Sequence, residues 1–267
     1  MAKSYSTVNV EESEDIHIIT MNRPERRNAL NPQLIYDLSQ ALDASTRCSC
    51  GVVVLTGAGT SFCSGMDLDH FRTLRDQRPE EQLADAEAIM WLMRHLHEIT
   101  KPTIAAVNGA AVAGGAGLAA LCDFTLSVPD AKFGFPEVKI GFIPAVVGVF
   151  LLPMLGEKLV RDLLLSGRLL SADEALAYGL VTAIAPAPEL MAHARSLGKS
   201  LLKNSPDSMR AVKELLNGFA KERLDRDLAR AVRWNERIRN SSDFHEGLRA
   251  FFEKREAVWP SRARKPK

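Results

Sequence analysis

The chain lacks the composition that marks several protein classes. It has only four cysteines in 267 residues, and its formal net charge is +1. A chain of this length can bury a sizeable core without disulfides. A near-zero charge gives no overall field that would attract nucleic acid or a membrane surface. No apolar run approaches the roughly 18 residues of a membrane span. We therefore expect no nucleic-acid partner and no membrane partner.

The cysteines are expected to be free thiols rather than metal ligands. Cys48 and Cys50 form a Cys-x-Cys pair, but no second pair or histidine cluster accompanies them in the sequence. Such a pair is a poor zinc site, so we expect no metal centre. Cys63 stands in a glycine-rich segment and is a candidate nucleophile, although its motif contains no histidine to activate it. Free thiols and the absence of an apolar leader segment predict a cytoplasmic protein.

Short apolar runs alternate with helical patterns over the first two-thirds of the chain, which is typical of a layered α/β domain. A helix is expected to begin after Asn31, with Pro32 at its first position. The segment Ser171–Glu174 has the pattern of a capping box, and Gly179 closes the helix that follows. Strands are expected at 16–22, 52–56, 103–107, 124–127 and 180–185.

From residue 186 onward the pattern is helical. We expect helices at 190–202, 206–219, 222–238 and 244–258, the last opened by Asp243 with Glu246 three residues on. A turn near Asn204 separates the first two of these helices. The sequence therefore predicts an α/β core over residues 1–200 and a helical C-terminal region over residues 201–267.

Two glycine-rich segments follow predicted strands. In 57–68, glycine, serine and threonine residues form a loop that can turn its N–H groups toward one point. Gly114 and Gly115 begin an apolar helix that ends near Cys122, so their N–H groups are free and have the helix dipole behind them. The second segment lacks the G-x-G-x-x-G spacing of a dinucleotide fold. Both segments are suited to binding an oxyanion.

Glu137 is the candidate acid/base. It lies between Pro136 and an apolar run, and apolar surroundings raise the pKa of a carboxyl group toward neutrality. An exposed loop glutamate is the alternative interpretation of this segment. Together with the two N–H-rich loops, Glu137 indicates a site that polarises a carbonyl group and moves the proton alpha to it.

These segments resemble the crotonase family, also called the enoyl-CoA hydratase/isomerase family, from about Ile18 to Trp259. The resemblance implies a spiral of β-β-α units with an all-helical C-terminal region that forms trimers, often stacked into hexamers. It implies an acyl-CoA thioester as the partner, and no cofactor apart from the coenzyme A of the substrate. The matching pieces are 22–31, 62–68, 101–109, 114–117, 133–137, 141–144, 171–179 and 243–255.

The resemblance also implies roles for individual residues. Met66 and Gly114 would donate the two oxyanion N–H groups, and Glu137 would be the acid/base. Lys254, in the terminal helix, would meet a phosphate of coenzyme A. The full set of expected substrate contacts is Arg26, Arg27, Ala29, Ser64, Gly65, Asp67, Leu68, Gly115, Gly117, Pro136, Phe142 and Lys254.

The sequence departs from the hydratase pattern at Gly117. Hydratases of the family carry two glutamates that hold and activate a water, and the first belongs at this position. The remaining pattern resembles the 3-enoyl-CoA to 2-enoyl-CoA isomerases, in which one glutamate takes a proton from C2 and returns it at C4. A hydratase with a substitute carboxylate, another acyl-CoA reaction and a non-catalytic acyl-CoA-binding protein stay open. The substitutes to consider are Asp67, Asp69, Glu81, Asp85 and Glu87.

Overall fold

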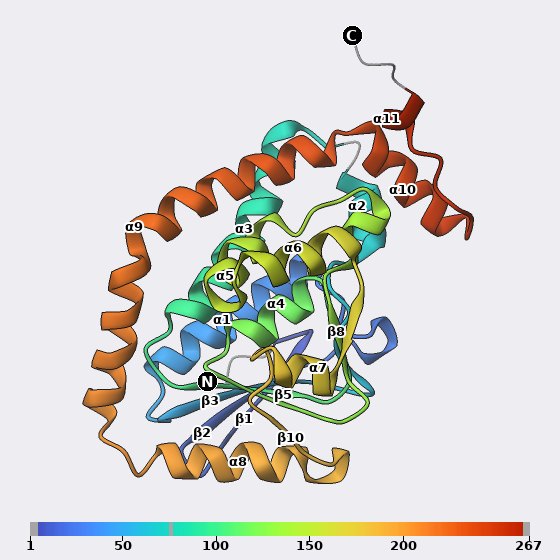
Figure 1. Ribbon diagram of the computed structural model, residues 1–267. Coiled ribbons are helices and arrows are strands. Elements are labelled where there is room, and N and C mark those ends of the chain that lie inside the picture. The colour runs from blue at the N-terminus through green and yellow to red at the C-terminus, as the bar shows by residue number, and fades with distance from the viewer. Residues whose placement is uncertain (1–4, 75–76, 264–267) are drawn as a thin grey trace.

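The computed structural model describes residues 5–74 and 77–263, and its strands form two sheets (Figure 1). The larger sheet has the order β1-β2-β3-β5-β7-β10, and β1 alone is antiparallel to its neighbour. The smaller sheet has the order β4-β6-β8-β9. The strands are β1 (Val8–Ser13), β2 (Ile16–Met21), β3 (Val52–Gly57), β4 (Ser61–Cys63), β5 (Thr103–Val107), β6 (Ala110–Val112), β7 (Phe124–Ser127), β8 (Lys132–Gly134), β9 (Leu169–Ser171) and β10 (Ala183–Ile184).

The chain alternates between the two sheets. Strands β3, β5 and β7 of the larger sheet are each followed by a short strand of the smaller sheet and then by helices. This β-β-α succession confirms the expected crotonase-like α/β fold. The predicted strands are confirmed, with β10 shorter than expected. The connecting helices are α2 (Leu68–Leu74), α3 (Pro79–Glu98), α4 (Gly114–Leu121), α5 (Ala145–Leu155), α6 (Glu157–Ser166) and α7 (Ala172–Ala177), with 3₁₀ turns η1 (Pro24–Arg26), η2 (Pro136–Ile140) and η3 (Ala187–Glu189).

The core lies on both faces of the larger sheet. Helices α1 (Pro32–Arg47) and α4 cover one face, and α8 (Leu190–Leu201) covers the other (Figure 1). Asn31 caps α1 as predicted, because its side-chain oxygen accepts a hydrogen bond from the Leu34 N–H at 2.9 Å. The capping box at Ser171 is also confirmed. The buried β-branched residues of β2 and β3 fill the space between these layers.

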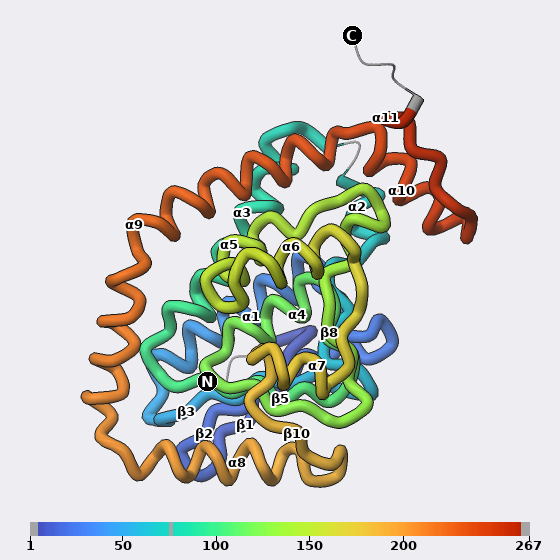
Figure 2. The backbone as a smooth tube through the Cα atoms, viewed as in Figure 1, coloured from blue at the N-terminus to red at the C-terminus, as the bar shows by residue number. Residues whose placement is uncertain are grey.

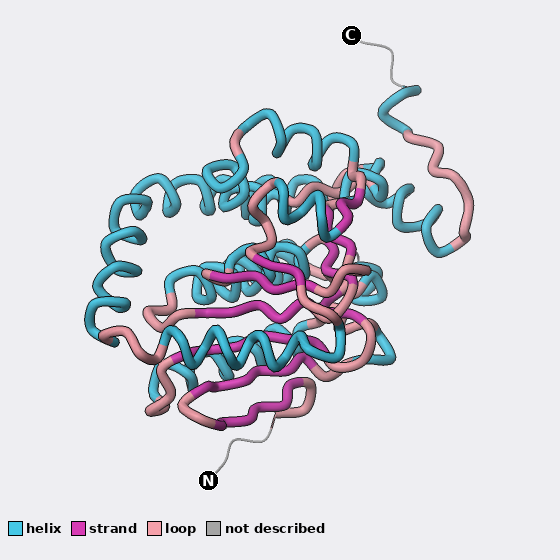
Figure 3. The backbone as a smooth tube through the Cα atoms, turned by 60° about the horizontal axis from the view of Figure 1, so that its bottom comes forward, coloured by secondary structure: helices cyan, strands magenta, loops and turns pink. Residues whose placement is uncertain are grey.

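The C-terminal region differs from the prediction in two ways. The expected helices 206–219 and 222–238 are one helix, α9 (Pro206–Arg239), which curves around the body of the molecule (Figure 2). It packs on α3 and α5, which outweighs the modest helix-weakening effect of Gly218. Helix α10 (Ser242–Phe252) is capped by Ser241 rather than Asp243 and ends before residue 258. The last helices, α10 and α11 (Pro260–Ala263), project from the sheet-containing body (Figure 3).

Asp243 and Glu246 do not form the expected capping box. Asp243 accepts hydrogen bonds from the backbone N–H and hydroxyl of Ser261. Glu246 binds Arg255 and the Val258 N–H, and the Arg255 hydrogen bond holds the pKa of its carboxyl well below the usual range. Both carboxylates therefore fix the chain that follows α10. The predicted division at residues 200 and 201 falls within the last turn of α8.

The expectation of four free thiols is wrong for one pair. Cys48 and Cys50 form a disulfide, and their Cα atoms are 5.3 Å apart. The tight connection between the end of α1 and the start of β3 brings the two side chains together. Cys63 and Cys122 are free and buried. Across residues 5–74 and 77–263, none of the helices combines the length and the apolarity that a bilayer crossing requires.

Candidate active site

The first N–H-rich loop follows β4 and is pinned against Leu30. The Leu30 N–H donates to the Gly65 carbonyl at 2.7 Å, and the Asp67 N–H donates to the Leu30 carbonyl at 2.9 Å. These two bonds flank Met66, so the Met66 N–H points away from Leu30. It donates to no backbone acceptor within the part of the chain that the structure describes. The Met66 N–H is therefore available to an external acceptor.

The second loop ends at the start of α4. Gly114 is the first residue of that helix, and the N–H groups of a first helical turn have no intrahelical acceptor. Ala113, just before it, has φ +53° and ψ −125°, a conformation that a residue with a side chain rarely adopts. Its N–H donates to the Gly134 carbonyl at 2.7 Å, which holds the strained turn to β8. Strain of this kind is typical of functional sites.

Glycines let the two loops approach each other closely. Gly65 has φ +88°, and a Cβ built on it would lie 3.5 Å from the Gly114 nitrogen and 2.7 Å from the Ala113 Cβ. A Cβ built on Gly115 would lie 2.2 Å from the Cys63 carbonyl oxygen. A side chain at either position would push the loops apart. The structure therefore brings the loop of Ser64, Gly65 and Met66 close to the loop of Gly114 and Gly115.

Glu137 is the second residue of η2. Strand β8 leads into η2, and its last residue, Gly134, pairs with Val112 just before the second loop. The Glu137 Oε2 atom is buried and has no hydrogen-bond partner among the described residues. Burial raises the pKa of this carboxyl to about 7. Glu137 therefore populates both its protonated and ionised forms near neutral pH, as a group that both takes and returns a proton must.

The space beside Gly117 is filled by apolar side chains. A Cβ built on Gly117 would lie 2.8 Å from Val147 Cγ2 and 3.2 Å from Met93 Cε. Met93 Cε also lies 3.7 Å from a Cβ built on Gly114, so this apolar wall adjoins the second N–H donor. Val147 comes from α5 and Met93 from α3, and both are buried.

The carboxylates considered as substitutes for a glutamate at position 117 are engaged elsewhere or exposed. Asp67 pairs with Arg23 and Asp69 with Arg26, each at 3.0 Å, and Glu81 pairs with Arg78 at 2.9 Å. Asp85 bonds Arg239 at 2.7 Å and His70 at 2.6 Å. Glu87 is exposed on α3.

The segment from Arg26 to Ala29 supports the first loop. The Arg27 carbonyl accepts the Ser64 N–H at 3.0 Å, and the Ala29 carbonyl accepts a hydrogen bond from Arg23. Asn28 is fully buried and donates to the Ser61 carbonyl at 2.8 Å. Neither Arg23 nor Asn28 was assigned a role from the sequence. Both stand in the 22–31 motif, but Asp67 and Ser61, the partners that join them to the first loop, lie more than thirty residues away in the chain.

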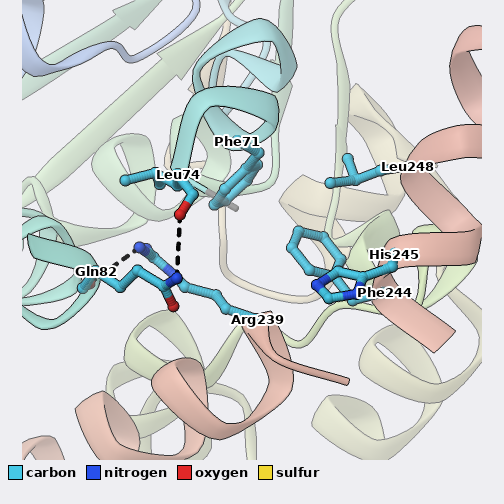
Figure 4. Close-up of a pocket in the computed structure, with 7 residues that line it drawn as sticks. All are labelled: Phe71, Leu74, Gln82, Arg239, Phe244, His245 and Leu248. Atoms are coloured by element: carbon cyan, nitrogen blue, oxygen red, sulfur yellow. Dashed lines mark hydrogen bonds between the residues drawn. The ribbon is translucent and has the colours of Figure 1, made fainter. Parts of the chain in front are cut away.

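Phe142 and Leu68 belong to an apolar cluster beside Met66. The rings of Phe71, Phe142 and Phe244 have centroids 4.8 to 5.4 Å apart, so α2, the segment after η2 and α10 meet here. Figure 4 shows the small cavity at its edge, whose volume of about 10 Å³ suits a single water. Seven residues line it: Phe71, Leu74, Gln82, Arg239, Phe244, His245 and Leu248.

Two expected site features are placed differently by the structure. Lys254 was expected within the terminal helix, but it lies after the end of α10, exposed and with φ +53°. Burial raises the pKa of the Cys63 thiol to about 12, so the thiol stays protonated at neutral pH. Cys63 therefore lacks the thiolate that a nucleophile requires.

One group of metal-ligand side chains lies outside the two loops. A ring nitrogen of His17 and the sulfurs of Cys48 and Cys50 are within 4.8 Å of one another. This group was not predicted from the sequence, because no histidine is near the two cysteines in the chain and His17 comes from β2.

The chain is similar to known proteins over nearly its whole length. Residues 11–262 match the family model described as enoyl-CoA hydratase/isomerase. A Thermus thermophilus protein named "Putative enoyl-CoA hydratase" is 43% identical over 90% of this chain and 95% of its own length. The 2,3-dehydroadipyl-CoA hydratase of Escherichia coli is 33% identical over 92% of this chain and 95% of its own. The crystal structure of an enoyl-CoA hydratase from Mycobacterium avium has a TM-score of 0.85 and 31% identity, and covers 95% of this chain and 99% of that one.

Proposed function

The chain belongs to the enoyl-CoA hydratase/isomerase family, and from this premise we propose that it converts a 3-enoyl-CoA into a 2-enoyl-CoA with Glu137 as its single acid/base. The family assignment supports an acyl-CoA thioester as the class of substrate. The reaction proposed here needs an oxyanion site and one group that both takes and returns a proton. It needs no activated water.

The Met66 and Gly114 N–H groups would bind the thioester oxygen. Neither donates to a backbone acceptor in residues 5–74 and 77–263, and the close approach at Gly65 supports their placement on neighbouring loops. When the C2 proton leaves, negative charge develops on that oxygen, and two preoriented donors stabilise it without reorganisation. Each donor of this kind contributes about 3 kcal/mol to the transition state.

Glu137 would move the proton. Its ionised form takes a proton from C2, the dienolate forms in the oxyanion site, and the protonated carboxyl returns a proton at C4. A pKa of about 7 favours both steps at neutral pH. Such a group contributes roughly 10²–10⁴ in rate.

The environment of Gly117 is the observation that carries the proposal. Val147 and Met93 occupy the space that a side chain at this position would enter. The carboxylates nearest in sequence to the first loop, Asp67 and Asp69, are paired with arginines. A second carboxylate to hold and activate a water therefore has no candidate among the substitutes considered.

Hydration of a 2-enoyl-CoA is the second candidate, because the relatives at 43% and 33% identity carry the name hydratase. Purified protein should be offered crotonyl-CoA and 3-hexenoyl-CoA separately, with Glu137→Gln as the control. We expect a higher kcat/KM for isomerisation of 3-hexenoyl-CoA. Faster hydration of crotonyl-CoA would favour the hydratase. Binding of both compounds without turnover would favour a non-catalytic acyl-CoA-binding protein.

Coenzyme A contacts are proposed for the segment from Arg26 to Ala29, for Asp67 and Leu68, and for Lys254. Arg26 and Arg27 lie beside the first loop, since Arg27 bonds Ser64. Lys254 is exposed and could reach a phosphate group. Beyond this coenzyme A, which is part of the substrate, the proposed reaction uses no cofactor.

A homotrimer, or a dimer of trimers, is proposed from the exposed apolar side chains of α9. Val212, Leu215, Leu216 and Phe219 follow helical spacing and are 54 to 78% exposed. An apolar stripe of this kind is typical of an interface. Light scattering after gel filtration should give about three times, or six times, the 29.4 kDa chain mass. Phe219→Asp should lower that mass, and a monomeric wild-type protein would contradict the proposal.

A further inference from the structure

The group formed by His17, Cys48 and Cys50 lies at the opposite end of the sheet from the two N–H-rich loops. His17 is near the amino end of β2, and Cys50 lies just before β3. Strands β2 and β3 are parallel, so both amino ends lie together. The first loop follows the carboxyl end of β3. The group is therefore separate from the acyl-CoA site.

His17 has one ring nitrogen in use and one without a partner. The side chain is 1% exposed, and its Nδ1 lies 3.2 Å from Glu12 Oε1. This contact favours the tautomer with the proton on Nδ1. The Nε2 atom is buried and has no hydrogen-bond partner among the described residues. A buried nitrogen lone pair without a donor costs free energy, which a metal ion would offset.

The surroundings also match the outer shell of a metal site. A carboxylate on the second nitrogen of a ligating histidine fixes the ring and makes it a better ligand, and Glu12 is so placed. Lys101 Nζ lies 3.7 Å from the Cys48 sulfur and 3.9 Å from the Cys50 sulfur, and it donates to the Cys48 carbonyl at 2.9 Å. The Lys101 side chain therefore contacts both sulfurs.

We propose that the reduced chain binds one zinc ion through His17, Cys48 and Cys50. Two thiolates and one imidazole are ligands that Zn²⁺ prefers, and tetrahedral coordination leaves a fourth position for water. Cys48 is half-buried, which gives that water access. The disulfide and the zinc complex are alternative states of the same two sulfurs.

Electrons and protons are conserved in the two steps that convert the disulfide into the zinc complex. A dithiol reductant gives two electrons and two protons to the Cys48–Cys50 disulfide, which becomes two thiols while the reductant closes to its own disulfide. Zn²⁺ then displaces two protons as two Zn–S bonds form. The site would join the end of α1 to β2 when zinc is bound and would be closed to zinc when the disulfide forms.

The test uses the full chain, reduced with dithiothreitol and freed of the reductant without air. Co²⁺ titration reports the ligands, because thiolate ligands give a sulfur-to-cobalt charge-transfer band and tetrahedral geometry gives intense d–d bands. Zinc affinity follows from competition with a chromophoric chelator. We expect one equivalent of metal per reduced chain and none for the oxidised chain. Saturating zinc should raise the Tm of the reduced protein by about 5 °C.

Variants separate this site from adventitious binding. Glu12→Gln keeps all three ligands and should weaken zinc binding by about 10–100-fold. Cys48→Ser, Cys50→Ser and His17→Gln should weaken it further. Cys122→Ser removes a buried thiol outside the group and should leave zinc affinity unchanged. Circular dichroism checks that each variant is folded.

Three results would overturn the proposal. The first is a reduced wild-type chain that binds no zinc. The second is zinc affinity that survives Cys48→Ser, the ligand variant at the most exposed position of the group. The third is a cobalt spectrum without the sulfur band, which would mean that the metal is bound at other side chains.

Discussion

Val147 occupies the space in front of Gly117. The 2.8 Å between Val147 Cγ2 and a Cβ built on Gly117 is shorter than any real contact of that kind, so a longer residue requires the valine to move. The resemblance to the family implies a carboxylate at this position in a hydratase. Here an apolar side chain from α5 fills the volume instead. The single-carboxylate isomerase reaction proposed for this chain follows from the presence of an apolar side chain where a second carboxylate would lie.

Substitution Gly117→Glu should destabilise the fold. A glutamate would have to displace Val147 and Met93, and overpacking a filled core costs about 1–3 kcal/mol. Urea unfolding measures this loss, and Val147→Ala in the same chain should restore part of it. Gly218→Glu is the matched control, because a Cβ at this exposed α9 position has nothing within 4 Å. Unchanged stability of Gly117→Glu would mean that the space is free.

Gly65→Ala should separate the two oxyanion donors. Its Cβ would meet the Ala113 Cβ at 2.7 Å and the Val112 carbonyl oxygen at 2.9 Å. Misplacing one donor should lower kcat/KM by about 10²–10³. Gly179→Ala imposes similar backbone strain, with φ +79° against +88°, but has no neighbour within 4 Å. Both variants should lose stability, and only Gly65→Ala should lose this much activity. Equal activities would remove the close approach from the mechanism.

The rate should rise with pH through about 7. The ionised form of Glu137 takes the C2 proton, and burial raises the pKa of this carboxyl to about 7. The pH profile of kcat/KM reports this ionisation in the free enzyme. We expect kcat/KM to fall about tenfold for each pH unit below the inflection. An inflection near the ordinary carboxyl value would contradict a buried Glu137.

Glu137→Gln should stabilise the protein at alkaline pH. Because the folded pKa of about 7 lies above the unfolded value, the folded state holds the proton more tightly. The contribution of the protonated Glu137 to the stability of the wild type is therefore fully present below the unfolded pKa and is lost as pH rises through about 7. Glutamine does not ionise. The free energy of unfolding of Glu137→Gln should be close to that of the wild type at acidic pH. At alkaline pH it should be about 1–3 kcal/mol higher than that of the wild type. A constant difference across pH would contradict the raised pKa.

The sequence predicts five of the six strands of the larger sheet, missing β1, and none of the strands of the smaller sheet. The runs Thr103–Val107 and Phe124–Ser127 are buried strands with the bounds expected from their apolar content. Strands of three residues such as β4, β6, β8 and β9 carry no periodicity that a sequence argument can detect. The continuity of α9 was also missed, because packing on α3 and α5 rather than local propensity decides it.

The candidate site likewise has features that could be predicted from the sequence and features that could not. The glycines at 65, 114 and 115 stand in local motifs, and the structure places them together as expected. The filling of the space at Gly117 depends on Val147 from α5, and the histidine beside Cys48 comes from β2. Contacts between residues far apart in the chain carry no local signal, so neither relationship could be predicted.

Hydrogen transfer within a single substrate molecule tests the central claim most directly. The enzyme should be given 3-hexenoyl-CoA with deuterium at C2, and the product should be analysed for deuterium at C4. Because Glu137 Oε2 is buried, exchange with water is limited, and we expect deuterium at C4 and loss of turnover in Glu137→Gln. A C4 hydrogen derived wholly from solvent, with turnover retained in Glu137→Gln, would contradict a single carboxylate that takes and returns the proton.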